Sequence, residues 1–384
     1  MNKAKTPSSS SPVDPSAEAP EAMTEPVPAT AGLHGTRNMP SVIVESYNLE
    51  VRDDEGFIGD RASQTAFRKL LDVWRKRKRK NGVDPMGNAR SADLSKSEID
   101  QMLQMKDATE ATDAVEGAIE EFAGELAGVI KRYLRQKAWK GVDRIVIGGG
   151  FPESDVGERA ILQAAVMLDA DNVQIGLARL RHEVDDGGLM GWVHLAPPRM
   201  VTEYDAILAL DIGGTNVRCG IVKPRWKKAS DLSKARVIKR LKWRHVDDNP
   251  KQAELVDGLV GMLEEMIAYS HKKGIRLAPF VGIACPGLIR QDGSIARGAQ
   301  NLPGDWERDD FHLPTALCEK IPLIGDEPTE ALMHNDAVVQ GLSELPFMQD
   351  VKRWAVLTIG TGLGNASYRN KRKNSRLPAS RAAS

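Results

Sequence analysis

Residues 206–222 read Ala-Ile-Leu-Ala-Leu-Asp-Ile-Gly-Gly-Thr-Asn-Val-Arg-Cys-Gly-Ile-Val. The apolar runs Ala206 to Asp211 and Val217 to Val222 lie on either side of a glycine pair, which is typical of two strands joined in a hairpin. The tip of such a hairpin can point at a ligand. This stretch therefore predicts where a binding loop leaves a β-sheet.

The turn within this stretch has the composition of a phosphate-binding loop. Gly213 and Gly214 permit positive φ and keep side chains away from the backbone N–H groups. Thr215 adds a hydroxyl, Asn216 follows it, and the carboxylate of Asp211 precedes the glycines. Backbone N–H groups and a hydroxyl suit phosphate oxygens, and a carboxylate suits a hydrated Mg²⁺ ion. Taken alone, the same residues could form an ordinary hairpin turn.

Two further glycine turns follow strand-like runs, one after residues 354–359 and one after residues 142–147. Two phosphate-sized turns can hold one triphosphate tail from both sides, and a third can let an adenine ring lie against bare backbone. The three turns together favour phosphate binding more strongly than any one of them. The additional turns are Gly360-Thr361-Gly362 and Gly148-Gly149-Gly150.

The rest of the chain has the pattern of an α/β protein. Apolar positions at three- and four-residue steps between Val115 and Tyr133 predict a long packed helix, and strands alternate with helices elsewhere. We expect further helices at 156–168, 252–272 and from Asn335, and strands at 142–147, 173–180, 280–285, near Leu323 and at 354–359. Gly and Pro clusters predict a turn at 185–188, a linker at 197–204 and irregular structure at 75–107.

Length and composition fit a globular protein. With 384 residues, of which 41% are hydrophobic, the chain can build two domains of ordinary size. Lysine plus arginine equals aspartate plus glutamate at 53 each, so no global charge favours nucleic acid or an anionic membrane. The Ser-, Pro- and Ala-rich residues 1–39 predict a disordered leader, and residues 367–384 predict a frayed basic tail.

A run of six basic residues extends from Arg75 to Lys80. Such a run usually marks the solvated end of a helix. Contact with nucleic acid is the alternative, but the run has no interleaved aromatic residues and no helix-turn-helix pattern follows it. We therefore expect a solvated segment.

The three cysteines, Cys219, Cys285 and Cys318, are odd in number and far apart. This argues against a disulfide framework and against a four-ligand zinc site, and it fits a reducing cytoplasm. No stretch approaches the roughly 18 apolar residues of a membrane-spanning helix, and no apolar segment follows the first lysines. We expect a cytoplasmic protein.

Several polar residues have the chemistry of a sugar kinase. Asp336 can accept the proton of a sugar hydroxyl that attacks a γ-phosphate, and Asn335 beside it can orient that hydroxyl. Asp336 could instead cap a helix. The amide of Asn301 can both donate to and accept from vicinal hydroxyls. Cys285 and Trp306 fit better as packing residues than as a nucleophile and a sugar platform.

Together these motifs resemble the ROK family (repressor, open reading frame, kinase), whose sugar kinases, glucokinase among them, have the actin-like ATPase fold. The resemblance implies an α/β, ribonuclease H-like protein with two α/β domains around a cleft. It also implies that both phosphate motifs grip ATP and that Asp211 holds Mg²⁺ through water. The matching segments, in family order, are 211–216, 282–287, 301–304, 335–336 and 360–364.

The family order is broken in one place. The glycine triplet that follows the second phosphate motif in the family precedes the first one here, at Gly148 to Gly150. Residues 40–200 resemble the family's C-terminal half, the adenine-side domain, with 75–107 as an insertion, and residues 201–366 resemble its N-terminal half. We therefore expect a circularly permuted chain, which folds tolerate because domain termini often lie close together at the surface.

The chain also departs from the family near the sugar. It has no match to the Glu-x-Gly-His segment from which family kinases reach the sugar, nor to the Cys-rich zinc segment, so we expect no zinc. Carboxylates between Glu50 and Glu55 could replace the missing segment, although no pattern assigns them.

The resemblance implies ATP-dependent phosphorylation of a hexose, with Asp336 as general base and with Asn301 and Asn335 as further sugar-binding residues. The expected partners are a sugar and a nucleotide, without nucleic acid or membrane, and a homodimer is compatible with them. A non-catalytic sugar or nucleotide sensor is the alternative, because the Glu-x-Gly-His segment is missing. Against it, the DNA-binding helices of family repressors are not found. An actin-like ATPase that acts on something other than a sugar is a third reading.

Overall fold

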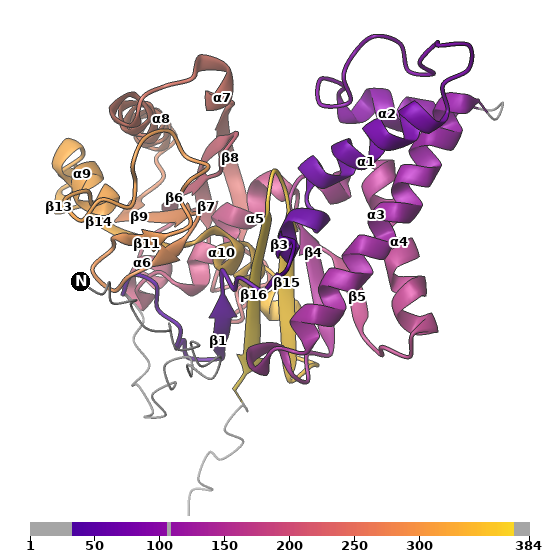
Figure 1. Cartoon of the computed structure of the whole chain (residues 1–384). Coiled ribbons are helices and arrows are strands. Elements are labelled where there is room, and N and C mark those ends of the chain that lie inside the picture. Colours follow the sequence, from indigo (N-terminus) through magenta and orange to yellow (C-terminus); the bar gives the residue numbers. More distant parts are fainter. Residues whose placement is uncertain (1–32, 106–108, 372–384) are drawn as a thin grey trace, which may run out of the picture.

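The computed structural model describes residues 33–105 and 109–371 of the chain. Its backbone is a mixed α/β arrangement built on two five-stranded sheets, each with helices packed against it (Figure 1). We call them the Asp211 sheet and the Gly148 sheet, after a residue in a central strand of each. In the described part of the chain, no helix is long and apolar enough to cross a membrane.

The Asp211 sheet confirms the predicted hairpin. Strands β6 and β7 pair antiparallel on either side of the glycine turn, and Asp211 lies opposite Arg218. The strand order is β14-β9-β6-β7-β8, with β9 parallel to both β6 and β14. The strands are β6 (Ala206–Ile212), β7 (Val217–Lys223), β8 (Arg236–Trp243), β9 (Leu277–Cys285) and β14 (Glu330–Asn335).

Helices cover the Asp211 sheet on the side away from the second sheet (Figure 1). The predicted helix at 252–272 is confirmed as α8 (Gln252–Lys272), whose residues Leu255, Leu259 and Leu263 are buried against the sheet because they recur on one face. Short elements complete this half: α7 (His245–Asp248), α9 (Leu313–Lys320), β10 (Leu288–Ile289), β11 (Ile295–Arg297), β12 (Leu323–Ile324) and β13 (Glu327–Pro328).

The Gly148 sheet combines strands from both ends of the chain. Its order is β1-β16-β15-β4-β5, with β1, β16 and β15 antiparallel and with β4 parallel to both β15 and β5. The strands are β1 (Val42–Tyr47), β4 (Arg144–Gly148), β5 (Gly176–Arg179), β15 (Arg353–Ile359) and β16 (Leu363–Asn370); the small β2 (Arg52–Asp53) and β3 (Gly56–Phe57) form a separate hairpin.

The two sheets share one pairing pattern. In each, three antiparallel strands are followed by two parallel ones, so that β15, β16, β1, β4 and β5 correspond to β6, β7, β8, β9 and β14. In the Gly148 sheet the chain is cut between the second and third strands of this pattern. Val42 pairs with Asn370, and the N–H of Lys371 donates to the carbonyl of Ser41 at 2.8 Å. The start of β1 and the C-terminal end of the described chain thus meet where the first sheet has a continuous connection.

Four helices lie on the outer side of the Gly148 sheet and share one apolar core with its strands. The predicted helix between Val115 and Tyr133 is confirmed within α3, and Ile119, Phe122 and Leu126 are fully buried on its inner face. The helices are α1 (Gln64–Arg77), α2 (Lys96–Leu103), α3 (Glu110–Leu134) and α4 (Asp155–Ala170), with short 3-10 turns η1 (Ile58–Ala62), η2 (Lys137–Trp139) and η3 (Phe151–Glu153).

A shared apolar core joins the two sheets. It contains Val146 and Val356 from the Gly148 sheet and Ile207 and Ala284 from the Asp211 sheet, packed around Trp192. Helices α5 and α10 lie between the sheets (Figure 1). The elements of this layer are α5 (Val184–Met190), η4 (Gly191–His194), α6 (Pro198–Thr202), α10 (Asp336–Leu342) and η5 (Leu345–Phe347).

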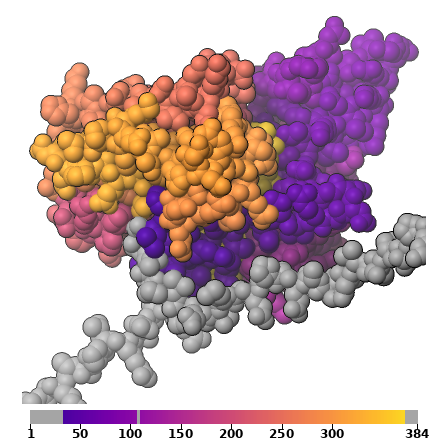
Figure 2. Space-filling view, turned by 60° about the vertical axis from the view of Figure 1, so that its left-hand side comes forward, coloured from indigo at the N-terminus to yellow at the C-terminus, as the bar shows by residue number. Residues whose placement is uncertain are grey.

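The N-terminal segment of the described chain also connects the two halves. The N–H of Gly35 donates to Met333 of β14 at 3.0 Å, and the carbonyl of Arg37 accepts from Val44 of β1 at 2.8 Å. Figure 2 shows these indigo residues lying against the orange part of the surface. The expectation of a disordered leader over 1–39 is therefore wrong for 33–39, where backbone groups find partners, and residues 1–32 lie outside the described residues.

The expectation of irregular structure at 75–107 is wrong in part. Helix α1 continues to Arg77, and α2 begins after Ser95, whose hydroxyl accepts from Glu98 N while the Glu98 carboxylate accepts from Ser95 N. This capping box starts a helix inside a Gly- and Pro-containing stretch. The basic run does end a helix, as predicted, but Arg75 is buried.

Three other boundaries differ from the prediction. The expected turn at 185–188 is helix α5, because glycines let it pack tightly: a Cβ on Gly188 would lie 2.5 Å from Asp211 Cγ. The expected linker at 197–204 contains α6, which begins with proline, a residue compatible with a first helical turn. The expected frayed tail is wrong for 367–370, because β16 pairs with strands on both sides up to Asn370.

Candidate functional site

Three parallel strands place the predicted chemistry on one edge of the Asp211 sheet. Asp211 near the end of β6 pairs with Ala284 of β9, and Asn335 at the end of β14 pairs with Cys285 of β9. Neighbouring strands lie about 5 Å apart, so Asp211 and Asn335 are roughly 10 Å apart across the sheet. Ligands of open α/β sheets bind at this carboxyl edge.

The two predicted phosphate loops meet, although they belong to different sheets. The hydroxyl oxygens of Thr215 and Thr361 lie 3.2 Å apart. Helix α1 supports the second loop, because Gln64 N donates to the Gly360 carbonyl at 2.8 Å and the Thr65 hydroxyl donates to the Thr361 carbonyl at 2.9 Å. Both loops can therefore contact the same phosphate chain.

The first phosphate loop is a closed turn. The N–H of Gly213 donates to Asn216 O at 2.9 Å, and the His245 ring bonds to the Gly213 carbonyl at 2.8 Å. Asn301 is exposed and lies beside the loop, since a Cβ on Gly214 would come within 3.0 Å of the Asn301 Cβ. The structure thus brings Asn301 next to the loop, as a shared site requires.

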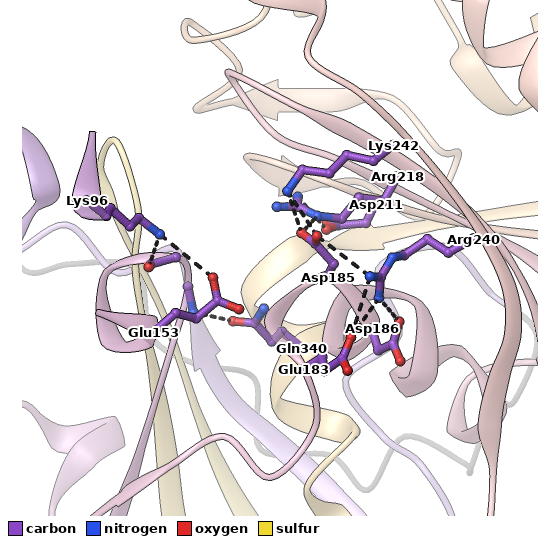
Figure 3. Close-up of polar contacts among 12 residues, drawn as sticks. Lys96, Glu153, Glu183, Asp185, Asp186, Asp211, Arg218, Arg240, Lys242 and Gln340 are labelled. Atoms are coloured by element: carbon purple, nitrogen blue, oxygen red, sulfur yellow. Dashed lines mark hydrogen bonds and ion pairs between the residues drawn. The ribbon is translucent and has the colours of Figure 1, made fainter. Parts of the chain in front are cut away.

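The glycine triplet packs against the second phosphate loop. Gly149 has φ +82°, and a Cβ there would lie 2.4 Å from the carbonyl oxygen of Ile359. Its N–H donates to the Gln340 side-chain oxygen at 3.1 Å, so this N–H is engaged within the protein (Figure 3). Gln340 belongs to α10 and had no role in the sequence interpretation; one glutamine in an apolar helix gave no specific signal.

Asn335, not Asp336, caps helix α10. The Asn335 side-chain oxygen accepts from Val338 N at 3.2 Å, and its amide nitrogen donates to Gly287 O at 2.9 Å. Each end of this buried amide therefore already has one partner within the protein. Its contribution is to fix the start of α10 and with it the position of the next residue, Asp336.

Asp336 is half-buried at the first turn of α10. Burial and the nearby Asp211 carboxylate raise its pKa to about 6. One carboxylate oxygen accepts from Ala337 N at 2.8 Å. A carboxylate with a raised pKa is a stronger base than a solvated one and is still ionised near neutral pH. This combination suits a general base.

Asp211 is neutralised by a neighbour in the same hairpin. Its Oδ2 lies 3.1 Å from Nη1 of Arg218, and Nε of Arg218 also contacts Asp185 of α5 (Figure 3). Burial raises the pKa of Asp211 despite this pairing. The arginine had no role in the sequence interpretation, although its place opposite Asp211 follows from the hairpin register.

The same face of the sheet carries two more cations. Arg240 contacts Asp186, and Lys242 lies 2.9 Å from Asp185, so these two basic residues of β8 reach the acidic start of α5. Their two-residue spacing puts them on one face of the strand. These ion pairs attach α5 to the Asp211 sheet (Figure 3).

Of the carboxylates between Glu50 and Glu55, Glu50, Asp53 and Glu55 have arginine partners. Hydrogen bonds from Arg132 and Arg61 lower the pKa of Asp53 to about 2. Glu50 pairs with Arg52 at 2.9 Å. These contacts give the acidic residues a structural role and offer no support for a role in sugar binding.

Two residues that were interpreted as packing residues are buried. Burial raises the pKa of the Cys285 thiol well above its usual value, so this cysteine is a poor nucleophile. Trp306 is 1% exposed and donates to Pro303 O at 2.7 Å. Within residues 33–105 and 109–371, no three His, Cys, Asp or Glu side chains form a group that could hold a metal ion.

No protein-family model matches the chain, and no curated protein matches it. Among solved structures, it is similar to a presumed N-acetylmannosamine kinase from Listeria monocytogenes, with 23% identity over 44% of this chain and 50% of that protein and a TM-score of 0.30. The chain thus spans about half the length of that kinase. An exopolyphosphatase-like protein matches at 14% identity over 66% and 89% of the two chains, also with a TM-score of 0.30. Likenesses this limited carry no argument about activity.

Proposed function

We propose that the chain transfers the γ-phosphate of ATP to a hydroxyl of a hexose, in a circularly permuted actin-like fold. The observation that carries the proposal is the meeting of the Thr215 and Thr361 loops at 3.2 Å, close to the sheet edge that holds Asp336. The two sheets have the same pairing pattern, but the strands of the Gly148 sheet follow one another in a cyclically shifted chain order. This supports the fold assignment.

In this proposal the two loops hold the phosphate chain. The hydroxyls of Thr215 and Thr361 and the N–H groups of Gly214 and Gly362 donate to phosphate oxygens. Asn301, exposed beside the first loop, binds the sugar. Phosphoryl transfer requires little covalent help from a protein, so positioning and charge compensation supply most of the rate.

Asp336 acts as general base on the attacking hydroxyl. Its raised pKa of about 6 brings its basicity toward the operating pH, and Asn335 fixes its place at the start of α10. The neighbouring Asp211 raises the proton affinity of Asp336 further, as two carboxylates in one site repel when both are ionised. Arg218 limits this effect by pairing with Asp211.

Asp211 fits a hydrated Mg²⁺ ion better than a directly bound one. One of its oxygens is engaged by Arg218, and Mg²⁺ commonly keeps several waters and uses only one or two carboxylates. When bound, the ion would supply charge compensation to the phosphates. Asp211 would accept hydrogen bonds from its water shell.

The test is turnover by the purified chain with Mg·ATP and a panel of hexoses, read as sugar phosphate by mass spectrometry. We expect one or more hexoses to be phosphorylated and the D336N variant to lose at least about 100-fold in turnover while it still binds ATP. The matched control is D326N, at an exposed loop aspartate. A wild-type protein that binds ATP but phosphorylates no hexose would show that the proposal is wrong.

A second candidate is a sensor that binds a sugar or nucleotide without catalysis. It is favoured by the protein partners of the Asn335 amide and by the arginine partners of Glu50 and Asp53, which leave fewer side chains for the sugar. Calorimetry that detects sugar binding to a chain without ATP turnover would support this candidate over the kinase.

A further inference from the structure

The side chain of Lys96 reaches the glycine triplet from helix α2. Its ammonium contacts the carbonyl oxygen of Gly150 and lies 3.7 Å from the Glu153 carboxylate (Figure 3). The side chain is 37% exposed, so the ammonium is near the surface but partly dehydrated. A lysine ammonium has three donors, and these two contacts leave capacity for a ligand.

A second ammonium faces the same space from the other sheet. Figure 3 shows Lys96 and Glu153 on one side and Lys242, Arg218 and Asp185 on the other, with the two lysine ammonium groups directed toward the region between. The pKa of Lys96 is lowered, mainly by burial and also by the charge of Lys242. The carboxylates of Glu153 and Asp185 act in the opposite direction. An anion between the two sheets would relieve the repulsion between the lysines.

The segment that carries Lys96 is held in place by a buried arginine. Arg75 of α1 donates to Asp84, Gly87 and Ser91, each at 3.0 Å. The capping box at Ser95 then fixes the first turn of α2, where Lys96 lies. Lys96 is therefore presented by an ordered support rather than by a solvated insertion.

We propose that Lys96 binds the phosphate groups of the nucleotide and that residues 78–103 thereby belong to the nucleotide site. The inference rests on the proposed function, since it takes the region between the glycine triplet and the Thr215 and Thr361 loops as the nucleotide site. On binding, the ammonium turns from the Gly150 carbonyl to a phosphate oxygen, where donor and acceptor are both charged and the attraction is stronger than to a neutral carbonyl. Lys96 is a positioning residue for the phosphate chain.

The test is calorimetric titration of the full chain with ATP, ADP and adenosine, without sugar. We expect K96M to weaken ATP and ADP binding about tenfold while adenosine binding is unchanged, because only phosphates pair with the ammonium. K96R, which keeps the charge, should stay within about threefold of the wild type. The matched control K137M, at an exposed lysine of η2, should bind all three ligands like the wild type.

The outcomes are distinguishable. If K96M binds ATP as tightly as the wild type, the inference is wrong and the proposed function stands. Equal weakening of ATP and adenosine would also overturn it, because Lys96 would then act by holding Gly150. A wild type that binds no nucleotide at all would overturn the proposed function and the inference together.

Discussion

The hydroxyl oxygens of Thr215 and Thr361 lie 3.2 Å apart, although the residues are 146 positions apart in the chain and belong to different sheets. Each hydroxyl follows a glycine in a turn after a buried strand. A contact between two such turns places their donors around a common point, where a phosphate chain can be held from both sides.

The Thr215 and Thr361 hydroxyls can be tested by replacing each with valine, which keeps the shape and removes the donor. We expect T215V and T361V each to weaken ATP binding about tenfold, in line with the loss of a hydrogen bond to a charged group. Isothermal calorimetry measures the change. T202V, at an exposed hydroxyl of α6, is the matched control. Unchanged affinity in both loop variants would remove these hydroxyls from the site.

The raised pKa of Asp336 predicts a pH dependence of activity. The carboxylate acts as a base only when ionised, so kcat/KM should rise with pH through about 6 and level off above it. D211N should move this rise in kcat/KM to lower pH, because the Asp211 charge is one cause of the raised pKa of Asp336. If kcat/KM of D211N rises at the same pH as that of the wild type, the two carboxylates are not coupled.

The raised pKa of Asp336 also predicts how the stability of D336N compares with that of the wild type at different pH values. The native pKa of about 6 exceeds the ordinary value of 3.8, so the native state binds the proton more tightly than the unfolded state. This contribution to stability is fully present below pH 3.8 and is lost as the pH rises through 6. D336N should therefore unfold at a higher temperature than the wild type at pH 8, and the difference should shrink below pH 6. A pH-independent difference in Tm would argue against a half-buried Asp336 that is ionised at pH 8.

The strand-turn motifs could be predicted from the sequence because each depends on local chemistry. The hairpin at Gly213 needs only two apolar runs and two glycines, and α3 needs only a repeat of apolar positions on one face. Helix α5 was missed because Gly187 and Gly188 are read locally as a turn, whereas the tight approach to Asp211 that selects glycine is a tertiary contact.

Parts of the candidate site were beyond a local pattern for the same reason. Lys96 reaches Gly150 from a segment that a buried Arg75 holds against α1, and a local pattern does not show this long-range contact. Likewise, the amide of Asn335 has the chemistry to orient a sugar, but its partners Gly287 and Val338 are set by the fold. Residue type indicates what a side chain can bind, and the surrounding packing decides what it does bind.

Arg218 holds two acidic residues, and its removal should be strongly destabilising. R218M removes the partner that Asp211 and Asp185 share. The side chains of these two aspartates are only 11% and 20% exposed. Loss of one partner from a buried ion pair costs about 3–5 kcal/mol, which urea unfolding can measure. R240M, on the same face but at a more exposed pair, should cost about 1 kcal/mol. Adding D211N to R218M should recover part of the loss, and no recovery would mean that Arg218 stabilises through packing alone.

Gly149 and Gly82 form a matched pair for testing the glycine triplet. Both have positive φ, +82° and +78°, but a Cβ on Gly149 would lie 2.4 Å from the Ile359 carbonyl oxygen, whereas nothing lies within 4 Å of one on Gly82. G82A should therefore show only the backbone strain, about 1 kcal/mol, and unchanged ATP binding.

G149A should lose several times more stability in urea unfolding, because the backbone at the end of β15 must shift. That shift moves the adjoining Gly360 loop, so G149A should also bind ATP at least about tenfold more weakly at a temperature where it remains folded. Equal stability of the two variants would show that the triplet tolerates a side chain, and the close approach of β4 to β15 would then have no role in shaping the site.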